Sequence, residues 1–134
     1  MPTQQKWYLN DRIVFVEFAG ELSVDDIVEA LETSINYVER SAAQPVHFLH
    51  DWTQLKKFPT NILQIRRQSD IRLSDRSKLG WMVAYGNDNR LMRYISQTVT
   101  YLFDIRFRMF STREEALRFL HKMDDTLDGS PLPM

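Results

Sequence analysis

The chain has 134 residues and a formal net charge of −1, with 43% hydrophobic and 26% charged residues. This length fits a single domain that buries about two thirds of the surface exposed by its unfolded chain. The near-zero charge gives no reason to expect nucleic acid or an anionic membrane as a partner. The sequence contains no cysteine, which excludes disulfide bonds, thiolate nucleophiles and cysteine-ligated metals.

The amino-terminal segment lacks the apolar core of a signal peptide, and no apolar run approaches the ~20 residues that cross a bilayer. We therefore expect a cytoplasmic protein with no membrane partner and no nucleic-acid partner. No sequence feature indicates a cofactor.

Two strands are predicted near the amino terminus, over residues 6–10 and 12–19, and the polar pair Asn10-Asp11 suits a tight hairpin turn between them. Both faces of the second strand are largely apolar, as a strand inside a sheet requires. Ser23 is a good helix cap and is followed by acidic residues. Apolar residues then recur at helical spacing, at Ile27, Leu31, Ile35 and Val38.

Residues 45–67 are the stretch around which we expect a site to form. Val46, Phe48 and Leu49 predict a buried strand that ends at Asp51. Pro59 disfavours helix at the residue before it, and Thr60 is predicted to cap a helix that begins at Asn61. Because α/β folds carry their sites at the carboxyl ends of strands, this junction is the favoured place for a site.

The rest of the chain continues the alternation of strands and helices. Residues 79–85 predict an apolar strand, residues 91–102 a helix, and residues 105–110 a strand with one polar face. Residues 111–114 match a capping box at the start of a last helix, whose buried side is predicted to carry Ala116, Leu117, Phe119 and Leu120. We expect a single domain over residues 1–124 and a flexible tail over residues 125–134.

Alternating strands and helices favour parallel pairing through right-handed crossovers. We therefore predict an α/β fold with one sheet of about five strands, an antiparallel hairpin followed by parallel strands, and about four helices. The predicted core contains Phe15, Val16, Leu31, Phe48, Leu49, Val83, Ile95, Phe107 and Leu117.

Four segments carry a resemblance to a known family: VEFAGEL (16–22), VHFLHDWTQLKKFPTN (46–61), LGWMVAYGNDNR (79–90) and FRMFSTREEALRFL (107–120). Together with the order of elements, they resemble the STAS domain, or anti-sigma factor antagonist (SpoIIAA-like) family. In regulatory members, a Ser or Thr at the start of the second helix accepts phosphate from a partner kinase, and Thr60 matches that position. The family often has Asp before this hydroxyl and Gly soon after it, whereas this chain has Pro59 and Asn61-Ile62-Leu63.

The resemblance implies a non-enzymatic regulatory module that docks a protein partner, either a kinase or an anti-sigma-like protein, and that is switched by phosphorylation at the second helix. The candidate residues for this surface are Trp52, Lys56, Lys57, Phe58, Thr60 and Asn61. Trp52 and Phe58 fall in the predicted polar turn, where they either form an exposed apolar surface or fold back over the sheet edge. The alternative function is a small-ligand binding domain of the same fold, with an apolar pocket for a lipid or nucleotide between sheet and helices.

No catalytic or metal-binding residue is predicted. His47 and His50 lie three residues apart on a predicted strand, so strand alternation places them on opposite faces. Asp51 beside His50 permits an acid–base interpretation, but no nucleophile motif accompanies the pair.

Two segments carry opposite charge. Residues 56–78 hold seven basic and two acidic residues, a net charge of +5, and residues 21–40 hold six acidic and one basic residue, a net charge of −5. These charges form either two solvated helix faces or a polarised surface for a protein partner or a homodimer.

Overall fold

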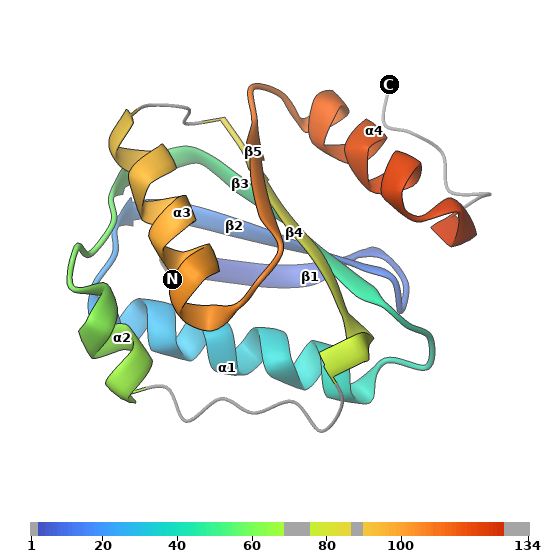
Figure 1. The fold of residues 1–134 in the computed structure, drawn as a ribbon, viewed down its shortest axis with the longest axis horizontal. Coiled ribbons are helices and arrows are strands. Elements are labelled where there is room, and N and C mark those ends of the chain that lie inside the picture. The colour runs from blue at the N-terminus through green and yellow to red at the C-terminus, as the bar shows by residue number, and fades with distance from the viewer. Residues whose placement is uncertain (1–2, 69–75, 87–89, 128–134) are drawn as a thin grey trace.

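The structure is a computed structural model that describes residues 3–68, 76–86 and 90–127. Within these residues the strands form one five-stranded sheet in the order β1-β2-β3-β4-β5 (Figure 1). β1 and β2 pair antiparallel, and the other neighbouring strands pair parallel. This confirms the predicted α/β class with an opening hairpin. The strands are β1 (Thr3–Leu9), β2 (Ile13–Glu21), β3 (Val46–Lys57), β4 (Leu79–Tyr85) and β5 (Phe107–Phe110).

Helices lie on both faces of the sheet. α1 and α2 pack on one face, and α4 with the short η2 turn packs on the other. α3 contacts α2 and β5. The helical elements of the described chain are α1 (Val24–Arg40), α2 (Ile62–Gln68), η1 (Arg76–Lys78), α3 (Arg90–Phe103), α4 (Arg113–Met123) and η2 (Asp125–Leu127).

The hydrophobic core consists of two clusters, one on each face of the sheet. We predicted a single group of core residues, but strand alternation sends neighbouring residues to opposite faces. Val16 and Phe48 therefore join the cluster beneath α1, and Leu49, Val83 and Leu117 join the cluster beneath α4. Three further predicted core residues are only partly buried, namely Phe15, Leu31 and Phe107. The side chain of Ile95 lies outside the described residues.

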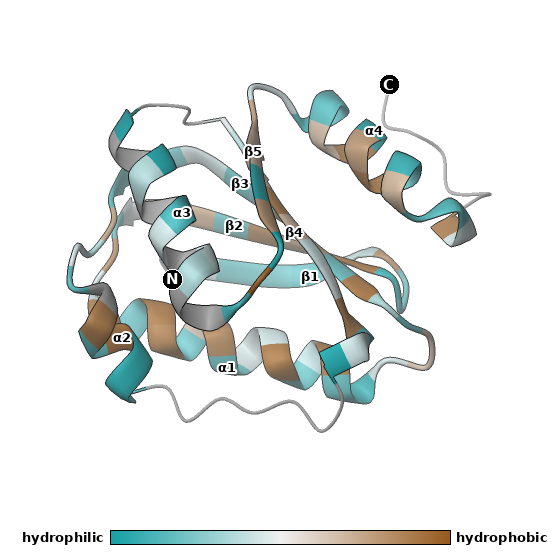
Figure 2. Ribbon diagram, viewed as in Figure 1, coloured by the Kyte–Doolittle hydropathy of each residue, from teal (hydrophilic) through white to brown (hydrophobic). Residues whose placement is uncertain are grey.

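Helix α1 begins as the sequence predicts. The Ser23 hydroxyl accepts a hydrogen bond from the Asp26 N–H at 3.1 Å, and the Asp26 carboxylate accepts one from the Ser23 N–H at 2.9 Å. Bands of hydrophobic residues recur along the helix in Figure 2. The buried face is rotated from the predicted stripe and contains Ile27, Ala30, Ser34 and Val38. Ser34 is tolerated there because its hydroxyl donates to the Gln5 side chain at 3.2 Å.

Three predicted boundaries are wrong. β3 does not end at Asp51 but continues to Lys57, because residues 54–57 pair along the end of β2. The cap of α4 is Thr112 rather than Ser111, since the Thr112 hydroxyl accepts from the Glu115 N–H at 3.2 Å. The fold also continues past residue 124, because Leu127 in η2 is buried in the cluster beneath α4. Residues 128–134 of the predicted tail lie outside the described residues.

Candidate functional site

The predicted docking residues lie where β3 ends and α2 begins. Lys56 and Lys57 are exposed at the end of β3, and Thr60 and Asn61 are exposed in the turn that follows. Asn61 caps α2, because its side-chain oxygen accepts from the Gln64 N–H at 3.3 Å. The predicted capping role of Thr60 is therefore wrong, and its hydroxyl lies one residue before the cap.

Trp52 and Phe58 are core residues rather than surface contacts. Because β3 is longer than predicted, Trp52 lies inside the strand and is 3% exposed, and Phe58 is 7% exposed. Their rings lie 6.1 Å apart, and the Trp52 ring lies 5.7 Å from that of Phe107. The interpretation of both residues as exposed apolar contacts is wrong, and the alternative that they fold back onto the sheet holds.

Exposed apolar side chains occur instead on α2 and α3, which contact each other. Leu63 on α2 is 55% exposed, and on α3 Tyr94 and Tyr101 are 65% and 85% exposed. We call Thr60, Leu63, Tyr94 and Tyr101 the α2–α3 surface. Leu63 lies two residues before the buried Ile65, and at 3.6 residues per turn this separation places the two side chains on nearly opposite sides of α2.

His50 is buried on the face of the sheet that α1 covers. Its ring lies between those of Phe18 and Phe107, at centroid distances of 4.9 and 6.2 Å. Burial lowers the pKa of His50 to about 3, so the ring is neutral at pH 7. Across the described part of the chain, neither nitrogen of this ring nor the Trp52 indole N–H has a hydrogen-bond partner.

The structure does not support an acid–base pair of His50 and Asp51. Asp51 points to the opposite face of the sheet, where its carboxylate accepts from the N–H and the hydroxyl of Thr53 at 2.9 and 2.7 Å. Nor do the described residues contain a cluster of three His, Asp or Glu side chains that could hold a metal ion.

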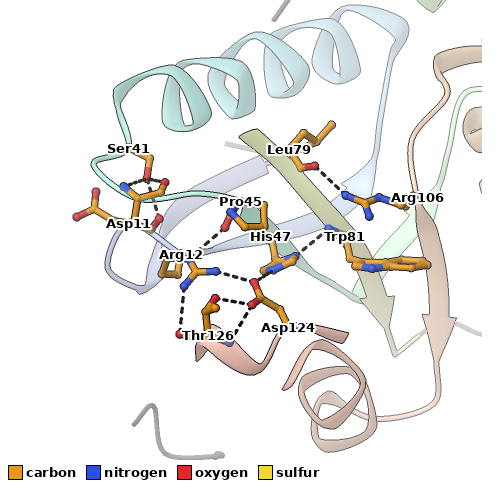
Figure 3. Close-up of polar contacts among 11 residues, drawn as sticks. Asp11, Arg12, Ser41, Pro45, His47, Leu79, Trp81, Arg106, Asp124 and Thr126 are labelled. Atoms are coloured by element: carbon orange, nitrogen blue, oxygen red, sulfur yellow. Dashed lines mark hydrogen bonds and ion pairs between the residues drawn. The ribbon is translucent and has the colours of Figure 1, made fainter. Parts of the chain in front are cut away.

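His47 lies on the face that α4 covers, and both of its nitrogens are paired (Figure 3). Nδ1 accepts from the Trp81 N–H at 2.8 Å, which leaves the proton on Nε2, 2.8 Å from an Asp124 carboxylate oxygen. The ring also packs tightly on β4, because a Cβ at Gly80 would lie 2.2 Å from Nδ1. Burial lowers the pKa of His47 although the Asp124 carboxylate raises it.

Asp124 is the centre of this polar network. Arg12 donates to it at 2.6 Å, and Thr126 donates through its N–H at 3.0 Å and through its hydroxyl. Burial opposes the shift, but the hydrogen bonds from Thr126 and His47 and the charge of Arg12 lower the pKa of Asp124 to about 2. Arg12 also donates to the carbonyl groups of Pro45 and Thr126. The sequence does not reveal this network, because Asp124 is the last residue of the predicted domain and Thr126 falls in the predicted tail.

The two oppositely charged segments adjoin within one molecule. The Lys78 ammonium group lies 3.7 Å from a Glu39 carboxylate oxygen, and α1 contacts α2. Part of the positive segment, residues 69–75, lies outside the described residues. No helix of the described chain is long and apolar enough to cross a membrane.

Comparison with solved structures identifies the fold. The chain is similar to an uncharacterized protein of the DUF3478 family with a SpoIIAA-like fold from Shewanella loihica PV-4, with a TM-score of 0.58 and 15% identity over 88% of this chain and 91% of that chain. It is also similar to the anti-sigma factor antagonist SpoIIAA in its unphosphorylated form, with a TM-score of 0.54 and 17% identity over 89% of this chain and 97% of that chain. At these identities the likeness concerns the fold alone.

Comparison with protein families gives the stronger assignment. No curated protein gives a significant match to the chain. A model of the SpoIIAA-like family matches residues 13–121, which span β2 through most of α4. The predicted resemblance is confirmed, and the chain belongs to the SpoIIAA-like family.

Proposed function

We propose that this protein is a regulatory interaction module, with no catalytic activity of its own, that docks a protein partner on the α2–α3 surface. The observation that carries the proposal is the exposure of Leu63, Tyr94 and Tyr101 on two contacting helices. Large exposed apolar groups of this kind mark interaction sites, and tyrosine is enriched in their energetic centres. One structural relative is an anti-sigma factor antagonist, which favours a kinase or an anti-sigma-like protein as the partner.

The charges around this surface favour an acidic partner. Lys56 and Lys57 are exposed before the turn, and Arg67 is exposed on α2. Complementary charge raises the association rate and disfavours wrong partners.

Thr60 provides a place for a phosphate-dependent switch. Its side chain is exposed, and so are those of Lys56 and Lys57, which lie four and three residues before it in the chain. A phosphate would add roughly −1.5 to −2 charges. Because Asn61 caps α2, the modification leaves that cap in place and acts by changing the charge that the partner meets.

The docking proposal is tested by capturing a partner from the cells that make the protein, purifying it and measuring its affinity. Leu63→Ser combined with Tyr101→Ser should weaken binding at least tenfold, because it removes the apolar centre of the surface. Met123→Ser is the matched control, since Met123 is an exposed apolar residue on α4. Equal affinity of the double variant and the control would reject the α2–α3 surface.

The switch is tested with the same partner. Thr60→Glu should change the affinity, whereas Thr60→Val, which removes the hydroxyl without adding charge, should leave it close to that of the wild type. If Thr60→Glu binds as the wild type does, docking at this surface does not respond to charge at position 60.

We also keep the homodimer as a proposal, although the structure weakens the charge argument for it. The opposed segments already meet within one molecule at Lys78 and Glu39. A dimer held by the remaining charges would weaken with salt, because charge interactions are screened over about 8 Å at physiological ionic strength. A monomer mass by light scattering at low salt and high protein concentration would exclude it.

A second candidate function is the binding of a small ligand, a lipid or a nucleotide, between the sheet and the helices. It is favoured by the buried polar atoms of His50 and Trp52, which lack partners among the described residues. Buried polar atoms usually have a hydrogen-bond partner, and a polar ligand group would supply one. Native mass spectrometry of the freshly purified protein should then show a bound compound, and Trp52→Phe, which removes the indole N–H, should reduce its occupancy.

A further inference from the structure

The His47 ring joins the carboxyl-terminal part of the fold to the sheet through both of its nitrogens. It accepts from the Trp81 N–H on β4 and donates to Asp124, which lies between α4 and η2. This arrangement requires a neutral ring, because Nδ1 is an acceptor only when it carries no proton. A second proton would place an N–H directly against the Trp81 N–H.

The packing of the ring against β4 restricts how it can avoid this conflict. Gly80 lies so close that even a Cβ there would be 2.2 Å from Nδ1, so the ring is fixed against the β4 backbone. Its side chain is almost completely buried. A protonated His47 must therefore either keep two opposed donors in contact or leave its place and give up the bond to Asp124.

The charges that face His47 do not favour a second proton overall. Asp124 attracts it, whereas Arg12 before β2 and Arg106 before β5 repel it. The Arg106 guanidinium is held nearby, 3.0 Å from the Leu79 carbonyl oxygen and 5.5 Å from the centre of the Trp81 ring. The Asp124 carboxylate is already shared with Arg12 and Thr126, so it offers little further compensation.

We propose that His47, Asp124 and Arg12 form a proton-sensitive clasp, which holds the end of α4 and η2 on the sheet while His47 is neutral and releases them when His47 is protonated. Release uncovers the cluster beneath α4, because Leu117, Leu120 and Leu127 pack there against the sheet. Burial lowers the pKa of His47 below its ordinary value of 6.5. The neutral His47 ring therefore contributes its full stabilisation of the clasp above pH 6.5, and this contribution decreases as the pH falls below that value.

Amide hydrogen exchange between pH 7.5 and 5.0 tests the clasp, after correction for intrinsic exchange rates. Protection of α4 and η2 should fall, by up to about tenfold for each unit by which the fold lowers the pKa of His47. Protection of β2 and β3 should fall less. This internal comparison matters because protonation of His50, buried in the other cluster, would weaken the whole fold.

Two variants test whether the pH dependence of α4 exchange comes from His47 or from another titrating group. His47→Gln keeps an amide donor and an acceptor but does not titrate, so the pH dependence of α4 exchange should disappear. His121→Gln is the matched control, because His121 lies on α4 itself, and it should retain the pH dependence of the wild type. The clasp is rejected if wild-type α4 exchange does not depend on pH, or if His47→Gln behaves as the wild type.

The clasp can also be tested on the wild-type protein, so this test does not depend on whether a variant folds. The proton resonance of His47 Cε1 and the amide resonances of α4 and η2 can be followed by NMR over the same pH range. A common midpoint is expected, and separate midpoints would overturn the proposal.

Discussion

Two histidines on β3, three residues apart, have opposite surroundings. His47 faces α4, and each of its nitrogens has a partner at 2.8 Å. His50 faces the other side of the sheet, and neither of its nitrogens has a partner within the described residues. The same residue type on the same strand is thus part of a complete polar network on one face and an unpaired group on the other.

The two faces differ in how their buried polar groups are paired, and we propose binding only on the side with unpaired groups. On the α4 side, Asp124 and Arg12 have several partners each, and Leu127 closes the cluster. The other side combines unpaired buried polar atoms with exposed Leu63 and Tyr101 on the helices α2 and α3. Natural proteins tolerate such locally unfavourable features mainly at functional sites. We therefore expect variants on the two faces to differ in what they change.

The largest loss of stability should follow Phe48→Ala. Phe48 is fully buried in the cluster beneath α1, and truncating a buried phenylalanine costs about 3–5 kcal/mol of unfolding free energy. Chemical denaturation measures this loss. An unchanged denaturation midpoint would show that this face contributes little to the core.

His50 should make stability depend on pH. Its pKa falls to about 3 in the fold from an ordinary 6.5, so its stabilising contribution is present above pH 6.5 and is lost as the pH falls toward 3. Each pH unit in this window should cost at most about 1.4 kcal/mol of unfolding free energy. His50→Phe should flatten the dependence measured by denaturation at pH 7 and pH 4. If the unfolding free energy of His50→Phe depends on pH as that of the wild type does, the dependence comes from other groups.

Asp124→Ala should cost about 2–3 kcal/mol of unfolding free energy, because it leaves the buried His47 N–H and the Nη2 group of Arg12 without their acceptor. Asp125→Ala is the matched control. Asp125 is exposed in η2, and exposed substitutions of this kind usually stay within about 0.5 kcal/mol. Equal losses for the two variants would mean that the network around Asp124 adds nothing to stability.

The smallest effects should distinguish the two residues before α2. Asn61→Ala should cost about 1 kcal/mol, since it removes the helix cap. Thr60→Ala should cost less than about 0.5 kcal/mol, since Thr60 is exposed and lies outside the cap. Thermal denaturation of both variants gives the comparison, and the reverse order would restore Thr60 as the cap.

Much of the fold could be predicted because its signals are local. Apolar runs marked β2 and β4, and the acids after Ser23 marked the start of α1. The family resemblance followed from the same order of elements.

The parts that could not be predicted depend on contacts between distant residues. The end of β3 is polar and looks like a turn, but its backbone pairs with β2. Asp124 looks like the last residue before a tail, and only the fold brings it to Arg12 and His47, more than 70 residues away in the chain. At the start of α2, Thr60 and Asn61 are both suitable caps, and only the geometry of the helix decides between them.

The contact between His47 and Gly80 has a consequence for the evolution of the family. Because a methyl group at position 80 would overlap the imidazole ring, a side chain at position 80 is compatible only with a smaller or displaced residue at position 47. Relatives with alanine or a larger residue at the position equivalent to Gly80 should have a smaller side chain at the position equivalent to His47. An alignment of family members should show this covariation, together with loss of the acidic residue equivalent to Asp124 wherever the ring is absent.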